Sequence, residues 1–220
     1  MKRRVVITGM GALSPVGNNA PDTWQAIKDG VCGIDKITHF DTTDFKAKLA
    51  GEVKDLDMEA YFTKRDLKFN DRFTQFARIA AKQAMEDSQL NVEAIDATRF
   101  GVIVASGIGG IETIEGAEDN LQQRGPSRVS PYFIPMALVN LAAGSVAIDV
   151  QAKGHCSSQV TACAAGSNAI GEAFHKIRDG YQEIMLAGGT EASITPLAVA
   201  GFSSMRALHT GEDKTRASIP

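Results

Sequence analysis

The stretch Gln159–Gly180, QVTACAAGSNAIGEAFHKIRDG, places a cysteine where one local pattern gives way to another. Residues Gln159–Ala162 are predicted to end a strand. The residues that follow are small and then apolar at helical spacing, which predicts a helix that stops near Gly180. Cys163 would lie at the N-terminus of that helix, where unpaired N–H groups and the helix dipole favour a thiolate. A buried structural cysteine is the alternative, because free cysteine is among the most buried residue types.

The composition describes a soluble globular protein. The chain has 220 residues, of which 44% are hydrophobic and 22% charged, and its length allows one good-sized domain or two small ones. We find no internal repeat or linker, so we predict a single domain over residues 1–220. A net charge of −3 offers no electrostatic case for a nucleic-acid partner.

Cysteine usage and hydropathy indicate the compartment. Three cysteines without a framework of spacings suggest a reducing environment. The apolar run Val5–Gly11 is too short for a signal peptide, and no uninterrupted apolar stretch of about 18 residues is available to span a bilayer. A cytoplasmic location without a membrane partner is therefore expected.

Strand and helix patterns alternate along the chain. The apolar runs Arg4–Thr8, Phe100–Ala105 and Glu183–Ala187 predict buried strands. Residues Asn70–Gln89 form the clearest helical pattern, with Asn70 as the candidate cap. Further helices are expected near residues 21–30, from the SGIGGIET segment to Arg124, and over residues 136–150, whereas residues 31–62 are expected to form loops and short strands. The alternation predicts an α/β fold with a largely parallel central sheet.

The glycines at positions 9, 11 and 17 follow the first predicted strand but do not form a G-x-G-x-x-G pattern. No acidic residue stands at the distance expected of a ribose ligand. A dinucleotide cofactor is therefore not predicted.

Three long segments resemble the condensing enzymes, the β-ketoacyl-acyl carrier protein synthases, and within them the synthase II group. They are RRVVITGMGALSPVG, VTACAAGSNAIGEAFHKIRDG and LAGGTEASITPLAVAGFSSMRAL, which together span Arg3 to Leu208. The resemblance implies a thiolase-like fold, in which two similar α/β halves form a five-layered αβαβα sandwich. This chain resembles the N-terminal half. Because it ends in the polar segment HTGEDKTRASIP, where the second half is expected to follow, we expect a truncated form.

The resemblance implies that Cys163 is the nucleophile and that its own N–H serves the oxyanion hole. An acyl group would pass from the phosphopantetheine arm of acyl carrier protein to Cys163, and malonyl-carrier protein would lose CO2 and attack the thioester. No further cofactor and no metal are implied. The two histidines that assist decarboxylation lie outside this chain, and His155 and His175 are too far along it to replace them. Condensation by these residues alone is therefore not expected.

The resemblance also suggests an acyl pocket and a dimer. Ile108 resembles a gate beside the nucleophile, Phe133 a residue that reaches the pocket from a partner subunit, and Phe202 a pocket-lining aromatic. Ordinary core packing is the alternative for all three. The segment His155–Ala162 is expected to pair with its copy in a homodimer, with Cys156 in the interface or the core.

Acyl carrier protein is strongly acidic, so its docking surface should be basic. Arg65, Lys68 and Arg206 are the predicted docking residues. A solvated helix face is the competing interpretation.

Other functions remain open from the sequence. Synthase I and polyketide ketosynthases are alternatives within the family, and carrier identity and chain length would separate them. A non-catalytic chain-length factor or a carrier-binding partner is the alternative of a different class, although the presence of Cys163 argues against the former. Thiolases share the fold but use coenzyme A thioesters and different flanking motifs.

Overall fold

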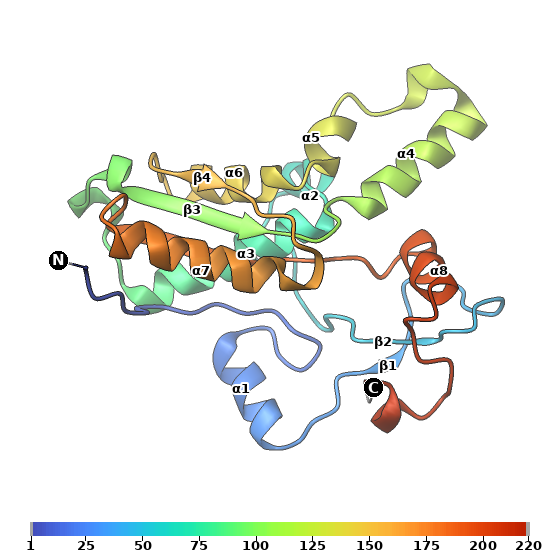
Figure 1. Ribbon diagram of the computed structural model, residues 1–220. Coiled ribbons are helices and arrows are strands. Elements are labelled where there is room, and N and C mark those ends of the chain that lie inside the picture. Colours follow the sequence, from blue (N-terminus) through green and yellow to red (C-terminus); the bar gives the residue numbers. More distant parts are fainter. Residues whose placement is uncertain (1, 219–220) are drawn as a thin grey trace. The chain divides into compact units, whose positions relative to one another are not determined.

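The computed structural model describes residues 2–218, and the chain forms two compact units (Figure 1). The first, which we call the sheet unit, contains the residues up to Gly11 together with Tyr61–Ala192. The second, the hairpin unit, contains Ala12–Ala60 and the residues from Ser193 onward.

A three-stranded parallel sheet forms the centre of the sheet unit. Its order is β4 (Cys156–Ser157), β3 (Phe100–Ala105) and β5 (Ile184–Gly189). All six residues of β3 are buried, as its continuous apolar run predicts. The register pairs Phe100 with Ile184 and Ala105 with Gly189, so β3 and β5 end side by side. The expectation of a buried strand at Glu183–Ala187 was wrong in its burial, because β5 is an edge strand of this sheet and its residues up to Gly188 are only half-buried.

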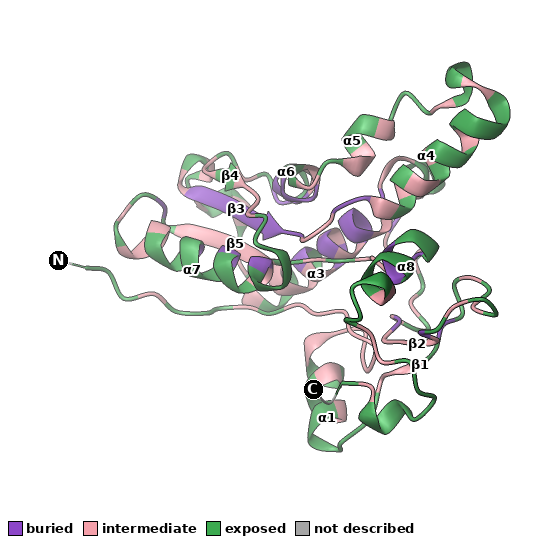
Figure 2. Cartoon of the chain, turned by 45° about the vertical axis from the view of Figure 1, so that its right-hand side comes forward, coloured by how far each residue is buried: buried purple, intermediate pink, exposed green. Residues whose placement is uncertain are grey.

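Helices cover both faces of this sheet. Phe100, Val102 and Val104 pack with α3 (Arg72–Ser88) and α6 (Asn140–Asp149) on one face. The alternate residues Ile103 and Ala105 pack with α7 (Ala165–Arg178) on the other. Figure 2 shows the buried residues concentrated on β3 and on parts of α3 and α6. Side chains of successive residues in a strand point to opposite faces, so β3 packs against helices on both sides of the sheet. A parallel sheet covered by helices on both faces confirms the α/β prediction.

One buried carboxylate binds the first turns of two helices. Asp71 is 4% exposed and caps α3, where its Oδ1 accepts the N–H of Phe73 at 3.2 Å. Its Oδ2 accepts the N–H and the hydroxyl of Thr113, at 3.1 and 2.6 Å, in the first turn of α4 (Ile111–Arg124). Asn70 was the wrong choice of cap, because it ends the short preceding helix α2 (Lys64–Phe69).

Shorter elements connect these helices. The expected helix over residues 136–150 is divided into α5 (Phe133–Ala137) and α6, because Leu138 takes an extended backbone that ends α5. Single turns of 3-10 helix complete the sheet unit: η1 (Val92–Ala94), η2 (Ala97–Arg99), η3 (Pro126–Arg128) and η4 (Ala162–Ala164).

The N-terminal segment is extended but does not join the sheet, so the prediction of a buried strand at residues 4–8 was wrong. The side chains of Val6 and Ile7 are 61% and 80% exposed. Strand formation requires a neighbouring strand to complete the backbone hydrogen bonds, and no strand pairs with this segment among residues 2–218. Its glycines instead press against the backbone of α3, with Gly9 against Ala84 and Gly11 against Ala80.

The hairpin unit is built around a small antiparallel pair. It contains α1 (Ala20–Lys28), β1 (Asp35–Lys36), β2 (Leu49–Ala50), α8 (Pro196–Ser204) and η5 (Lys214–Arg216). Ile37, Ala47 and Val199 form its core. Cys32, in the segment expected to form loops and short strands, is exposed and does not belong to this core.

A buried carboxylate also organises the hairpin unit. Glu52 accepts the N–H and the hydroxyl of Thr38 at 2.9 and 2.7 Å. Burial alone would raise the pKa of Glu52, but these hydrogen bonds and the nearby His39 outweigh it and lower the pKa.

We predict that Asp71→Ala lowers the free energy of unfolding by about 3 kcal/mol, because one helix cap is lost and the donors of Thr113 are left without this acceptor. Asp96→Ala is the matched control. Asp96 accepts the N–H and hydroxyl of Thr98 at 2.9 and 2.7 Å at an exposed turn, so its removal should leave the thermal midpoint close to wild type. Equal midpoints for the two variants would contradict the role assigned to Asp71.

Candidate active site

Cys163 lies at the exposed turn that leads into α7. It is the middle residue of η4, and this single turn ends directly before the 14 residues of α7. The thiol is free and exposed, so the alternative of a buried structural cysteine is wrong. The expected strand over residues 159–162 is also wrong, because β4 ends at Ser157. The chain instead turns at Ala162, whose φ of 50° lies in the left-handed region that alanine rarely adopts.

The start of α7 provides a positive electrostatic end beside this cysteine. Its N-cap residue is Ala164, which offers no side-chain hydrogen bond to the first turn. Unpaired N–H groups at a helix start carry partial positive charge and stabilise nearby anions. The other end of α7 carries Lys176 and Arg178 in its last turn, which complements the dipole. The positive end of the α7 dipole therefore lies at the turn that carries Cys163.

Two glycines allow the start of α7 to approach the end of β5. A Cβ atom built on Gly189 would lie 2.8 Å from the Cα of Gly166, closer than real Cβ atoms tolerate. Gly189 is the last residue of β5 and pairs with Ala105, the last residue of β3. The carboxyl ends of two parallel strands therefore meet the start of the helix that follows the cysteine. Ligands in α/β proteins bind characteristically at this end of the strands.

The loop that follows β3 reaches the same place. We call Ser106–Gly110 the gate loop. A Cβ atom on Gly107 would lie 3.5 Å from the carbonyl oxygen of Ala162, so the gate loop lies against the turn of Cys163. The structure thus brings the loop of Ile108 and the candidate nucleophile together.

Sequence reasoning missed Glu191, which binds the gate loop directly. Its carboxylate accepts the N–H groups of Gly107 and Ile108, at 2.8 and 3.2 Å, and the hydroxyl of Ser106 at 3.2 Å. The only available signal was its position just after a predicted strand, at the edge where strand ends meet.

This arrangement agrees with the comparisons to known proteins. The family model for the beta-ketoacyl synthase N-terminal domain matches residues 2–220. The chain belongs to this family. A 3-oxoacyl-[acyl-carrier-protein] synthase 2 of Staphylococcus aureus (strain COL) is 50% identical over 218 residues, which are 99% of this chain and 53% of that protein. The protein of the same name from Synechocystis sp. is 46% identical over 220 residues, again 53% of its length. The chain therefore spans about half the length of the curated relatives it matches.

Solved structures of ketosynthases share the fold. One is the complex of a type II PKS acyl-carrier protein with its ketosynthase. A chain of that complex aligns with a TM-score of 0.84 and 33% identity, over 100% of this chain and 53% of that one. A beta-ketoacyl synthase from Burkholderia phymatum STM815 aligns with a TM-score of 0.82 and 29% identity, over 97% of this chain and 52% of that one. The prediction of a thiolase-like fold, represented by its N-terminal half, is confirmed.

Phe133, Phe202 and Arg206 are the remaining residues that the sequence analysis singled out near the site. Phe133 is half-buried at the start of α5, and α5 contacts the gate loop through the hydrogen bond from Gly110 N–H to the Ala137 carbonyl at 3.2 Å. Phe202 lies in α8 of the hairpin unit, as does Arg206 just after it. Their roles beside Cys163 stay predictions.

The predicted docking residues of α2 form a cationic and aromatic surface. Arg65 and Lys68 are exposed and lie 6.0 and 5.6 Å from the centroid of the Phe69 ring. That ring packs on Tyr132 with 4.1 Å between centroids. Between the two cations in sequence, Asp66 instead contacts Arg78 at 3.3 Å. Hydrogen bonds from Thr63 and the Arg78 guanidinium lower the pKa of Asp66, so it remains ionised and holds α2 in place.

The nearest histidines in sequence have other contacts. The ring of His155 is 2.9 Å from the hydroxyl of Ser157, and its carbonyl accepts the N–H of Val102 at the start of the sheet. Burial and the charge of Lys176 lower the pKa of His155. His175 lies in the last turn of α7, at the opposite end from Cys163.

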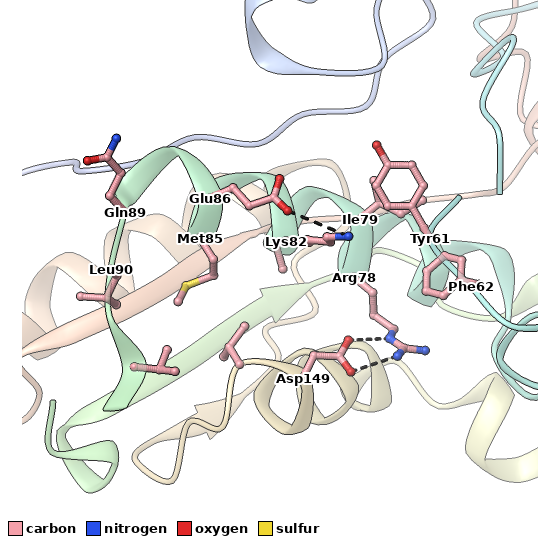
Figure 3. A pocket seen from close by; sticks show the side chains of 13 residues that line it. Tyr61, Phe62, Arg78, Ile79, Lys82, Met85, Glu86, Gln89, Leu90 and Asp149 are labelled. Atoms are coloured by element: carbon pink, nitrogen blue, oxygen red, sulfur yellow. Dashed lines mark hydrogen bonds and ion pairs between the residues drawn. The ribbon is translucent and has the colours of Figure 1, made fainter. Parts of the chain in front are cut away.

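A cavity of about 650 Å³ lies elsewhere in the sheet unit (Figure 3). Side chains of α3 and α6 line it, and its charged groups are paired: Arg78 with Asp149 at 2.6 Å, and Lys82 with Glu86 at 3.9 Å. It lies on the sheet face covered by α3 and α6, whereas α7 follows Cys163 on the other face. The cavity is therefore not the site of the cysteine chemistry.

Two further properties concern residues 2–218. We find no cluster of metal-ligating side chains in this part of the chain. None of its helices combines the length and the hydropathy needed to cross a membrane.

We predict that Gly189→Ala slows alkylation of Cys163 by iodoacetamide about tenfold or more, because the added methyl displaces the start of α7. Gly116→Ala, in the exposed middle of α4 where a Cβ meets nothing within 4 Å, is the control and should react as wild type. The rate is measured by mass spectrometry of peptides, with Cys32 as an internal reference. Unchanged reactivity of Cys163 in a folded Gly189→Ala protein would contradict the packing argument.

Proposed function

We propose that this chain carries the nucleophile of a 3-oxoacyl-acyl carrier protein synthase 2, which elongates fatty acids by decarboxylating condensation. The observation that supports it most is the exposed Cys163 thiol at the uncapped start of α7, beside a glycine-rich loop. The family membership and the names of the relatives that match at 46–50% identity point the same way.

The first step is acyl transfer. The Cys163 thiolate attacks the thioester carbonyl of an acyl-carrier protein, and the negative charge moves to the carbonyl oxygen. We propose that the Cys163 N–H stabilises that oxyanion, and the positive end of α7 supports this role. Collapse of the intermediate breaks the bond to the phosphopantetheine sulfur, which leaves as a thiolate and takes up a proton. The acyl group remains on Cys163 as a thioester.

The second step forms the carbon–carbon bond. Malonyl-carrier protein loses CO2, and the resulting enolate attacks the thioester on Cys163. The sulfur leaves as a thiolate, and the product is a β-ketoacyl-carrier protein two carbons longer. We propose that the donors for decarboxylation come from outside these 220 residues, since the relatives are about twice as long. The substrates arrive on carrier protein, and no other cofactor is required.

Acyl carrier protein is the proposed partner. A related ketosynthase has been solved with its acyl-carrier protein, and the exposed Arg65 and Lys68 offer a basic surface for an acidic partner. We further propose that Arg206 also takes part in docking, that Phe202 contacts the acyl chain, and that the enzyme is a cytoplasmic homodimer in which Phe133 reaches the partner's pocket.

A non-catalytic role is the second candidate. One solved relative is the ishigamide ketosynthase/chain length factor, which aligns with a TM-score of 0.84 and 27% identity. The free thiol at the start of α7 favours the catalytic role, because a factor without chemistry needs no exposed cysteine there. Synthase I and polyketide ketosynthase activities are separated from synthase 2 by carrier and chain length.

We predict that intact-mass spectrometry of the full-length protein, after exposure to a long-chain acyl-carrier protein, shows a gain of one acyl group that Cys163→Ala abolishes. Cys156→Ala is the control and should acylate normally. Cys156 is exposed in β4 rather than in the core, but partial desolvation of its thiol raises its pKa and leaves less thiolate. An adduct that survives Cys163→Ala would refute the assignment. The same measurement on residues 1–220 shows whether they support the first step alone.

We predict that reversing both docking charges, Arg65→Glu with Lys68→Glu, raises the KM for acyl-carrier protein about tenfold at low salt and less at high salt. Alkylation of Cys163 should not change, because only the partner surface is altered. Lys153→Glu, an exposed lysine after α6, is the matched control. A KM independent of both the reversal and salt would contradict docking on α2.

A further inference from the structure

The first residues of the gate loop bind a carboxylate that no sequence motif identified. Glu191 accepts three hydrogen bonds from three consecutive residues, Ser106, Gly107 and Ile108. The Ser106 hydroxyl also accepts the N–H of Gly109 at 3.0 Å, so the contact extends to a fourth residue. The loop backbone is thus wrapped around one side chain.

The loop needs such an anchor because of its composition. Three of its five residues are glycine, and glycine loses more conformational freedom on ordering than any other residue. Gly109 adopts a φ of 80°, and a Cβ atom on it would meet the side chain of Val139 at 2.8 Å. Substitution by larger residues could therefore not stiffen this part of the loop. Two adjacent N–H groups that point to one side instead favour an anion, which Glu191 provides.

The backbone of Glu191 is itself fixed to the sheet. The preceding residue, Thr190, donates its N–H to the Ala105 carbonyl at 2.9 Å and its hydroxyl to the Phe73 carbonyl at 2.6 Å. One residue earlier, Gly189 packs on Gly166 in the first turn of α7. Glu191 thus extends from a rigid strand end that also positions the helix after Cys163.

These contacts connect the nucleophile to the gate. Gly107 lies between the Glu191 carboxylate, 3.0 Å from its Cβ position, and the Ala162 carbonyl, 3.5 Å from it. Ile108, the neighbouring residue, is half-buried and shares the same carboxylate oxygen. A displacement of Glu191 is therefore expected to shift Ile108 together with Gly107 at the Cys163 turn.

We propose that Glu191 is a positioning residue that fixes the gate loop against the Cys163 turn and thereby sets which acyl chains reach the sulfur. The inference rests on the proposed function for its substrate, but the positioning itself does not. Glu191 acts on the site through its hydrogen bonds to the loop. Its removal should change acyl-chain discrimination much more than the intrinsic reactivity of the thiol.

The test compares Glu191→Ala and Glu191→Gln with wild type in the full-length protein. Glutamine keeps one acceptor oxygen and should retain part of the loop contacts. The departure from wild-type behaviour should therefore be larger for Glu191→Ala than for Glu191→Gln. Glu112→Gln removes the same charge from the exposed first turn of α4 and is the matched control. Thermal melting checks that each variant is folded, and Glu191→Gln carries the test should alanine unfold the protein.

Hydrogen exchange measures the positioning without any substrate. The amides of Gly107 and Ile108 should exchange about tenfold faster in Glu191→Ala, since their acceptor is lost. Exchange as slow as in wild type would overturn the proposal. This measurement remains decisive even if the wild-type protein transfers no acyl group, a result that would defeat the proposed function alone.

Acylation of Cys163 measures the consequence. The ratio of acylation rates for a long and a short acyl-carrier protein should shift about fivefold in Glu191→Ala, while alkylation by iodoacetamide stays within about twofold of wild type. Faster exchange with an unchanged ratio would refute the role in chain selection. Equal losses of acylation and alkylation would show a general structural role and would also refute it.

Discussion

The contact between the end of β5 and the start of α7 is the constraint on which the rest of the site depends. It is possible only because Gly166 and Gly189 have no side chains, since one methyl group at Gly189 would overlap the helix backbone. The helix then begins beside the paired ends of β3 and β5, and Cys163 is exposed in the turn before it. Electrostatic stabilisation by the helix start follows from this geometry.

Two carboxylates complete the surroundings of that contact. Asp71 holds the starts of α3 and α4, and Glu191 holds the gate loop between β3 and α4. A glycine-rich connection is thereby fixed at both ends by acceptors from other segments. Because the loop is already ordered, it presents a defined surface to a substrate, and the loop need not be ordered again at each turnover.

Two apolar runs of similar sequence show that a strand depends on its tertiary partners as well as on its local pattern. The buried strand Phe100–Ala105 has neighbours on both sides and both faces, and its apolar run predicted it correctly. The equally apolar run near the N-terminus pairs with no strand among residues 2–218 and leaves Ile7 80% exposed. The same physical pattern thus gives a strand only where a backbone partner exists to complete the ladder.

The sequence by itself determined the α/β class, the central strand, the helix that follows the nucleophile and the position of Cys163 before it, because these follow from periodicity and residue type within a short window. Only the tertiary structure decided that Asp71 rather than Asn70 caps α3, that Ala162 makes the turn, and that Glu191 holds the gate loop. Asp71 and Glu191 bind groups some 40 and 85 residues away along the chain, and no local pattern records such pairs. The turn at Ala162 places alanine in a conformation that its own propensity opposes, so the surrounding fold must impose it.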